Sequence, residues 1–331
     1  MKKNNELLKI KNLSIEYKTD DGIVKAVDNM SFDIGVGETL GIVGETGAGK
    51  TTTALGIMRL VPNPPGKIVN GEINFRGENL LKKSEEDMRN IRGNKISMIF
   101  QDPMTSLNPV MTTEDQIAEV IILHQNVGKK EASEKAKAML ETVGIPAERG
   151  KDYPHQFSGG MRQRIVIAIA LACNPQLLIA DEPTTALDVT IQAQVLKLMK
   201  NLKEEFKTSM IMITHDLGIV ANICDKVAII YTGYTVEYAT KRELYTNPLH
   251  PYTQGLFGSI PSIDEDEARL KPIKGLMPEP TEIPNGCPFN PRCQKVMPIC
   301  LKELPNRVEV KDGHFVNCHL YKDKDQSMGG A

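Results

Sequence analysis

The residues best suited to chemistry in this sequence form the glycine-rich segment Gly44-Glu45-Thr46-Gly47-Ala48-Gly49-Lys50-Thr51. The segment fits the phosphate-binding pattern G-x-x-x-x-G-K-[ST] at every fixed position. Glycines let the backbone curl so that successive N–H groups point at one anion, beside the positive end of a helix dipole. Lys50 adds a mobile positive charge, and Thr51 adds a hydroxyl that can bind Mg²⁺. The segment predicts a metal-assisted polyphosphate site; the alternative is a glycine-rich turn with a chance lysine.

The elements on both sides of this segment are those that a phosphate-binding loop needs. The apolar run Thr39–Val43 predicts a buried strand. Residues 50–60 contain no proline and carry apolar side chains at helical spacing, which predicts a helix. Strand, glycine-rich turn and helix therefore follow one another in the expected order.

Two antiparallel strands are predicted before the loop. Residues 7–17 alternate between apolar and polar, and Asp20-Asp21-Gly22 predicts a tight turn into a strand at residues 23–27. Tyr17 ends the first of these strands, where its ring could stack on a purine. Its position alone favours an ordinary packing role.

Two acidic residues close a predicted buried strand. Leu177–Ala180 is a continuous apolar run that ends at Asp181 and Glu182. Asp181 can hold Mg²⁺ directly or through water, whereas Glu182 points to the opposite side and can accept a proton from an attacking water. The pair divides the roles of metal ligand and general base.

Two further strands also end in polar residues. Gln101 follows the strand at residues 96–100, and His215 follows the strand at residues 209–214. Either residue could be structural, Gln101 as a solvated strand end and His215 as an ordinary histidine. The carboxyl ends of strands in an open α/β sheet meet at one edge, which favours a shared site.

A helical insert is predicted between residues 104 and 172, with helices at 113–124 and 130–143. A further apolar helix runs to Cys173 and begins after Ser158-Gly159-Gly160. Ser158 is well placed as the N-cap, and the two glycines leave the start of the helix bare. Both a second phosphate site and an ordinary capped helix fit this pattern.

Together these motifs resemble the ATP-binding cassette (ABC) ATPases over about residues 7–258. The resemblance implies an α/β P-loop NTPase fold with a mainly parallel sheet core, an antiparallel β subdomain and a helical subdomain at about 102–172. It also implies a head-to-tail dimer in which ATP lies between the phosphate loop of one chain and Ser158-Gly159-Gly160 of the other. The usual LSGGQ signature reads Phe157-Ser158-Gly159-Gly160-Met161, so the glutamine is replaced.

The resemblance also implies a role for each motif residue. Tyr17 would stack on adenine, Gln101 would link metal and water to a membrane subunit, Glu182 would be the general base of ATP hydrolysis, and His215 would sense the γ-phosphate. The implied magnesium ligands are Thr51, Gln101 and Asp181. The implied nucleotide-binding residues are Tyr17, Gly44, Glu45, Thr46, Gly47, Ala48, Gly49, Lys50, Thr51, Thr52, Ser158, Gly159 and Gly160.

The C-terminal part of the sequence narrows the resemblance to the ATP-binding subunits of dipeptide and oligopeptide ABC importers. The segments that carry it are Asn247–Gln254, Pro278–Thr281, Gly286–Phe289 and Pro291–Cys293. Such a subunit pairs with a second ABC ATPase, two integral membrane permeases and an extracytoplasmic peptide-binding protein. Nickel and sugar systems share closely similar subunits, and a regulatory ABC ATPase is a further alternative.

Four cysteines lie in this C-terminal part, at positions 287, 293, 300 and 318. Their clustering in a polar segment favours metal thiolates over disulfides. The spacing lacks paired C-x-x-C units and leaves zinc and a [4Fe–4S] cluster open. Resemblance to cluster-bearing members of the subfamily favours an iron–sulfur cluster over zinc or free thiols, with the ligands Cys287, Cys293, Cys300 and Cys318.

Length and composition set the remaining expectations. A chain of 331 residues suggests one large domain, at residues 1–260, and a smaller C-terminal arm, at residues 261–331. The net charge of −2 argues against nucleic-acid binding through bulk positive charge. No signal peptide is visible, and no apolar stretch approaches the roughly 20 residues that span a bilayer. We expect a prokaryotic peripheral protein on the cytoplasmic face of the membrane, attached through permease subunits.

Overall fold

The computed structural model describes residues 6–185, 187–259 and 273–324, which form two compact units. The first unit is made of Met1–Leu7, Ile34–Thr39 and Leu80–Ile213, and the second of Leu8–Asp33, Leu40–Asn79 and Thr214–Ala331, as far as these ranges are described. Ala186 and the parts of the predicted arm at residues 261–272 and 325–331 lie outside the described residues.

Three parallel strands form the sheet of the first unit, in the order β8-β7-β6. They are β6 (Ile96–Ile99), β7 (Leu177–Asp181) and β8 (Ser209–Thr214), and every residue in them is buried. Parallel strands covered on both faces have such continuous apolar runs, which is why the sequence predicted all three. The carboxyl end of β7 is Asp181 itself, and Gln101 follows two residues after the end of β6.

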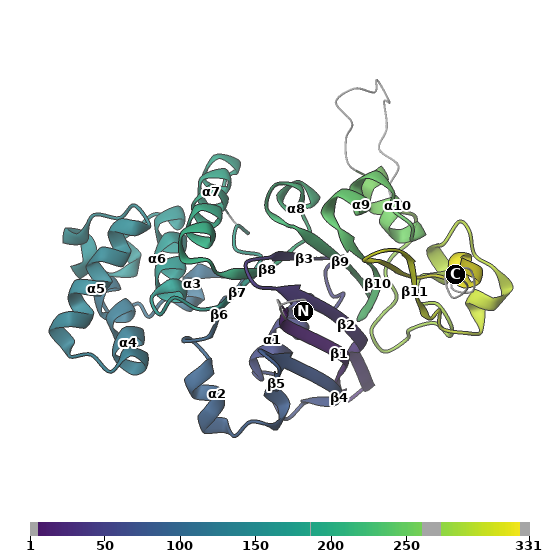
Figure 1. Cartoon of the computed structure of the whole chain (residues 1–331), viewed down its shortest axis with the longest axis horizontal. Coiled ribbons are helices and arrows are strands. Elements are labelled where there is room, and N and C mark those ends of the chain that lie inside the picture. Colours follow the sequence, from purple (N-terminus) through teal and green to yellow (C-terminus); the bar gives the residue numbers. More distant parts are fainter. Residues whose placement is uncertain (1–5, 186, 260–272, 325–331) are drawn as a thin grey trace, which may run out of the picture. The chain divides into compact units, whose positions relative to one another are not determined.

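Helices make up most of the rest of the first unit. Two of them, α4 and α5, pack against each other and lie beside α6 (Figure 1). These three confirm the predicted helices of the insert. The helices of this unit are α2 (Glu85–Ile91), α3 (Pro103–Ser106), α4 (Thr113–Gln125), α5 (Lys129–Thr142), α6 (Gly159–Leu171) and α7 (Val189–Phe206), with 3₁₀ turns η1 (Leu80–Lys82), η2 (Ala147–Lys151) and η3 (Pro154–Gln156).

The sheet of the second unit has the strand order β11-β12-β10-β9-β3. The predicted strand before the glycine-rich loop is β3 (Thr39–Val43), which pairs in parallel with β9 (Lys226–Tyr231). The remaining pairs are antiparallel and bring in β10 (Tyr234–Thr240), β12 (His314–Asn317) and β11 (Arg307–Lys311). The sequence analysis predicted none of these last three strands.

A separate antiparallel sheet in this unit has the order β2-β1-β4-β5. Strand β1 (Glu6–Thr19) confirms the first predicted strand, and β2 (Gly22–Gly35) starts at the predicted turn but runs well beyond residue 27. Strands β4 (Gly66–Phe75) and β5 (Glu78–Asn79) complete the sheet. The helices of the unit are α1 (Lys50–Met58), α8 (Leu217–Ile223), α9 (Lys241–Thr246) and α10 (Pro251–Gly258), with 3₁₀ turns η4 (Asn290–Arg292), η5 (Pro298–Leu301) and η6 (His319–Lys324).

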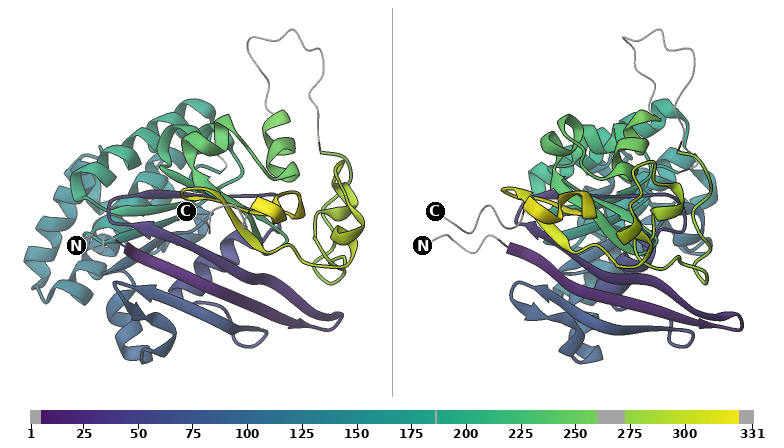
Figure 2. Two further views of the ribbon diagram at one scale, coloured as in Figure 1. Left: turned by 45° about the vertical axis from the view of Figure 1, so that its right-hand side comes forward. Right: turned by 90° about the vertical axis from the view of Figure 1, so that its right-hand side faces the viewer.

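The C-terminal strands are held to this sheet by backbone pairing and by a small core. Strands β12 and β10 lie side by side (Figure 2), with Glu237 opposite Val316. Val316 and Cys318 pack on Leu249, just before α10. The buried carboxylate of Glu237 accepts hydrogen bonds from the backbone N–H groups of Leu249 and His250, both at 2.8 Å, and fixes the start of α10.

Among the described residues, no helix has both the length and the apolar character that crossing a lipid bilayer requires.

Candidate nucleotide-binding site

The glycine-rich loop lies between β3 and α1, as predicted. Gly47 and Gly49 have φ values of +83° and +93°, a region that side chains other than glycine rarely occupy. A Cβ at Gly49 would lie 2.1 Å from the carbonyl oxygen of Ala26, and one at Gly44 would lie 2.2 Å from that of Ile230. The backbone can therefore follow this curve only with glycine at these positions.

Lys50 folds back over the loop. Its Nζ donates hydrogen bonds to the carbonyl oxygens of Gly44, at 2.8 Å, and Glu45, at 3.0 Å, and the residue is 6% exposed. Helix α1 begins at Lys50, and its N-cap residue, Gly49, provides no side-chain cap. A positive charge and the positive end of a helix dipole thus meet at one turn, an arrangement suited to a phosphate group.

Tyr17 and His215 belong to the same unit as this loop. Tyr17 is half-buried and lies opposite Gly66 on the neighbouring strand, where a Cβ at Gly66 would come within 2.8 Å of the tyrosine ring. His215 is exposed directly after β8. The next residue, Asp216, caps α8 by accepting a hydrogen bond from Gly218 N at 2.7 Å.

In the first unit, the structure brings Gln101 and Glu182 together. Gln101 Nε2 donates a hydrogen bond to Glu182 Oε2 at 3.3 Å, and Thr185 Oγ1 donates to the same oxygen at 3.0 Å. Asp181, one residue before Glu182, is 1% exposed. A buried carboxylate and a half-buried carboxylate held by two hydrogen bonds therefore follow one another at the end of β7, as metal binding and proton abstraction require.

Ser158 is the N-cap of α6, as predicted. Its Oγ accepts a hydrogen bond from Met161 N at 3.4 Å. A Cβ at Gly160 would lie 2.5 Å from Ile191 Cγ2, so α7 packs closely against this turn, whereas a Cβ at Gly159 would have its nearest contact at 3.7 Å. Asp188, directly before α7, caps this helix by accepting a hydrogen bond from Ile191 N at 2.9 Å.

The sequence analysis missed Arg149, which organises the segment around Ser158. Its guanidinium lies 4.2 Å from the ring centroid of Phe157, donates to Gln156 O at 3.0 Å and approaches Met161 Sδ at 3.6 Å. A methionine at the position of the usual glutamine therefore contacts a cation of the same chain. No local pattern around Arg149 could have indicated this role.

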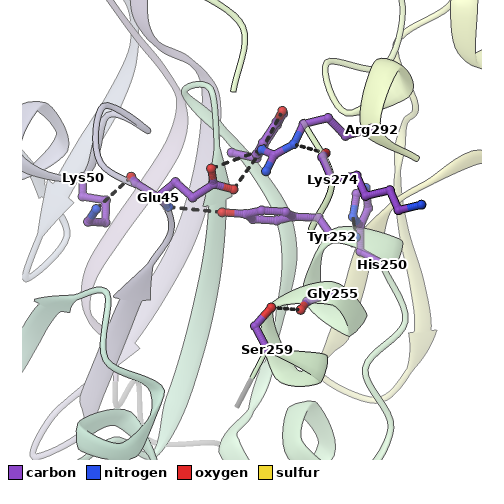
Figure 3. A network of polar contacts seen from close by, with 9 residues as sticks. Glu45, Lys50, His250, Tyr252, Gly255, Ser259, Lys274 and Arg292 are labelled. Carbon is purple, nitrogen blue, oxygen red and sulfur yellow. Dashed lines mark hydrogen bonds and ion pairs between the residues drawn. The ribbon is translucent and has the colours of Figure 1, made fainter. Parts of the chain in front are cut away.

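The sequence analysis also missed two residues that contact the phosphate loop from the C-terminal part of the second unit. Arg292 Nη1 donates to both carboxylate oxygens of Glu45, at 2.9 and 3.2 Å. Tyr252 Oη accepts a hydrogen bond from Glu45 N at 3.1 Å (Figure 3). Glu45 is thus bound through its side chain and through its backbone.

The four C-terminal cysteines lie in one region of the second unit. Cys287, Cys300 and Cys318 are each 8% exposed, and Cys287 N donates to Cys300 O at 2.8 Å. Burial, together with the charge of the other cysteines, raises the pKa of Cys287 to about 12 and that of Cys318 to about 11. Without a bound metal, the thiols of Cys287 and Cys318 therefore hold their protons at neutral pH.

A metal would bind these residues as thiolates, so its binding would displace their protons. Within the described residues, no group of three or more His, Cys, Asp or Glu could hold a metal ion. The expected iron–sulfur cluster, and zinc as its alternative, therefore find no support in this geometry. The spacing of the cysteines along the sequence predicted that they cluster, but it could not predict how their sulfur atoms lie relative to one another.

Two protein families match this chain. The family described as "ABC transporter" matches residues 27–185, and that described as "Oligopeptide/dipeptide transporter, C-terminal region" matches residues 236–300. The chain is 51% identical to the oligopeptide transport ATP-binding protein AppD of Bacillus subtilis, over 96% of this chain and 98% of AppD. It is 50% identical to the oligopeptide transport ATP-binding protein OppD of Escherichia coli, over 90% of this chain and 89% of OppD.

Solved structures of ABC cassettes match about 70% of the chain. The dimeric, post-hydrolysis cassette MJ0796 bound to ADP and Pi is 28% identical, with a TM-score of 0.64 over 71% of this chain and 99% of that one. CbiO1 of Clostridium perfringens is 25% identical, with a TM-score of 0.63 over 73% of this chain and 92% of that one. The chain belongs to the ABC transporter family of ATPases.

Proposed function

We propose that this ATPase binds and hydrolyses MgATP to drive the uptake of dipeptides or oligopeptides. The proposal rests on one observation. Over 90% or more of its length, the chain is about 50% identical in sequence to proteins named for peptide transport. The match of residues 236–300 to a C-terminal region described for peptide transporters adds a second, independent segment. The runner-up is the same ATPase serving nickel or sugar uptake.

The proposed roles are those that the resemblance to ABC ATPases implies. Lys50 binds the outer phosphates of ATP, and the hydroxyl of Thr51 would hold Mg²⁺ together with Gln101 and Asp181. Oxygen donors of this kind suit a small, hard cation, which supplies charge neutralisation on the phosphates when bound. Tyr17 stacks on adenine and His215 senses the γ-phosphate. The other proposed contacts to the nucleotide come from residues 44–52.

Glu182 is the proposed general base. Its carboxylate takes a proton from the attacking water, and its orientation comes from the hydrogen bonds of Gln101 and Thr185 to Oε2. General-base catalysis of this kind contributes about 10²–10⁴ in rate. Loss of the γ-phosphate then removes the group that bridges two cassettes.

The proposed partners are a second ABC ATPase, two membrane permeases and an extracytoplasmic peptide-binding protein. Ser158, Gly159 and Gly160 would contact ATP held by the partner ATPase, since the start of α6 offers backbone N–H groups and a hydroxyl. We propose a peripheral position on the cytoplasmic face of a prokaryotic membrane, with residues 1–260 as the ATPase domain and residues 261–331 as an arm.

A [4Fe–4S] cluster on the four cysteines is also proposed. It rests on their spacing and on the family resemblance, and no step of ATP hydrolysis depends on it. Protein purified without oxygen is expected to be brown and to contain about four iron atoms per chain. A colourless preparation with about one zinc per chain, or with no metal, would reject the cluster.

Growth experiments test the transport function. A strain that lacks the gene and needs an amino acid is supplied with that amino acid only as a di- or tripeptide, while nickel and sugar uptake are measured in parallel. The wild-type gene is expected to restore growth, and the Glu182→Gln variant is expected not to. If the wild-type gene restored nickel or sugar uptake and left peptide uptake unchanged, the transported substrate would be nickel or a sugar and not a peptide.

A further inference from the structure

We propose that Arg292 is a positioning residue of the nucleotide site, which acts on the phosphate loop through Glu45. Arg292 belongs to the C-terminal part of the chain, and Glu45 is the second residue of the loop. The inference rests on the proposed binding of ATP by residues 44–51. In this view, Arg292 fixes the loop and cancels a negative charge that would otherwise repel the phosphates of ATP.

Arg292 is a buried and well-held cation. Its side chain is 6% exposed, compared with 32% for Glu45 in the same ion pair. The Nε group donates to Lys274 O at 3.2 Å (Figure 3). The guanidinium also lies 5.7 Å from the ring centroid of Tyr231. A charge held in this way loses little conformational freedom when it pairs with Glu45.

Glu45 is held at each of its polar groups. Its N–H donates to Tyr252 Oη, its carbonyl oxygen accepts from Lys50 Nζ, and its carboxylate accepts twice from Arg292. Burial raises the pKa of Tyr252, and the charge of Glu45 raises it further. Tyr252 therefore remains a neutral hydroxyl that can accept the loop N–H.

The position of Glu45 makes its charge matter for nucleotide binding. It lies between Gly44 and Gly47, within the turn whose N–H groups and Lys50 would receive a polyanion. A carboxylate left alone there would repel each phosphate charge, and the repulsion is strong in a partly buried loop. Arg292 replaces this repulsion with a local charge near zero.

A merely structural role for Arg292 makes a different prediction. If Arg292 only anchored the C-terminal segment, its loss would lower the stability of the protein whatever residue stood at position 45. If it compensates the charge of Glu45, removal of that charge should repair the defect. The pair therefore calls for a double-mutant cycle.

The experiment measures the Kd for ATP with the full-length chain, together with kcat and KM for hydrolysis. Arg292→Ala is expected to weaken ATP binding and raise KM about tenfold, which corresponds to about 1.4 kcal/mol, with kcat within about twofold of wild type. The Arg292→Ala/Glu45→Gln double variant is expected to bind ATP within about threefold of Glu45→Gln alone. Arg292→Gln, which keeps hydrogen-bonding groups but no charge, serves if the alanine variant does not fold.

Lys295→Ala is the matched control. Lys295 is a cation three residues further along the same segment, and its Nζ donates to Gln254 Oε1 at 3.0 Å. Its loss should leave the Kd for ATP unchanged, whereas an equal loss of affinity in Lys295→Ala would overturn the inference. Wild-type affinity for ATP in the Arg292 variants would also overturn the inference, as would a loss of ATP affinity in Arg292→Ala that Glu45→Gln does not repair. If wild-type protein itself fails to bind ATP, the proposed function is wrong instead.

Discussion

Gln101 Nε2 donates a hydrogen bond to Glu182 Oε2 at 3.3 Å, across 81 residues of sequence. Glu182 has a φ of +45°, a left-handed conformation that residues other than glycine seldom adopt. Thr185 donates to the same carboxylate oxygen from three residues downstream. Backbone strain at a residue held by two side-chain donors is typical of a functional site, so the placement of Glu182 is specified by its surroundings.

Replacement of Glu182 by glutamine should stop hydrolysis without preventing ATP binding. The amide keeps the size of the side chain but cannot accept a proton from water, so kcat should fall about 10²–10⁴-fold while the Kd for ATP stays within about threefold. Phosphate release and ATP titration measure the two quantities, and gel filtration with ATP should show a trapped dimer. Glu204→Gln, on the exposed side of α7, is the control. Unchanged hydrolysis in Glu182→Gln would remove Glu182 as the base.

Ser158→Ala should combine a small loss of stability with a large loss of ATPase activity. The variant removes the N-cap hydrogen bond to Met161 N, which costs about 1 kcal/mol, and also removes the hydroxyl proposed to contact the nucleotide of the partner cassette. Thermal unfolding and steady-state hydrolysis are measured together. Ser84→Ala is a matched control, because Ser84 caps α2 through an equivalent bond to Asp87 N at 3.1 Å. Equal effects of the two variants on hydrolysis would reduce Ser158 to an ordinary cap.

The two glycines after Ser158 should behave differently when changed to alanine. Gly160→Ala should lower stability by about 1–3 kcal/mol, because its Cβ would lie 2.5 Å from Ile191 Cγ2. Gly159→Ala has room within the chain, with its nearest contact at 3.7 Å, so its stability should be unchanged or slightly raised. Its hydrolysis rate should nevertheless fall if phosphate approaches this backbone. Full activity in Gly159→Ala would place the phosphate elsewhere.

The sequence predicted those elements whose signals are local. Helices α4 and α5 begin within one residue of their predicted starts, because apolar residues at helical spacing mark them clearly. The fully buried strands β3, β6, β7 and β8 were also predicted, as was the cap at Ser158. In each case a few consecutive residues carry the information.

The features that the sequence could not predict depend on contacts between distant residues. Strands β11 and β12 have only five and four residues, too few for their alternation to stand out from the polar segment around them. The ion pair of Arg292 with Glu45 joins residues 247 positions apart. The cysteine spacing gives an order along the chain but no distances, so it could not show that three of the thiols are buried.

His250 should make the protein less stable as the pH falls below neutral. Burial lowers the pKa of His250 to about 4, against the opposing effect of the Glu237 carboxylate, while the unfolded chain keeps the ordinary value of about 6.5. Between these two values the unfolded state binds more protons, so the free energy of unfolding should fall with falling pH, by on the order of 3 kcal/mol in total.

Urea unfolding at several pH values from 7.5 to 4 measures this dependence. In the wild type, the backbone N–H of Tyr252 donates a hydrogen bond to His250 Nδ1 at 3.0 Å. In His250→Asn the amide oxygen can accept this hydrogen bond, but the side chain does not titrate. The variant should therefore show a flatter profile than wild type between about pH 6.5 and 4. His155→Asn, at an exposed position, should keep the wild-type slope. A buried neutral imidazole must take up a proton when the protein unfolds in acid, whereas an amide cannot, so the two proteins should differ in their pH dependence. Parallel profiles for wild type and His250→Asn would therefore show that His250 does not cause the loss of stability.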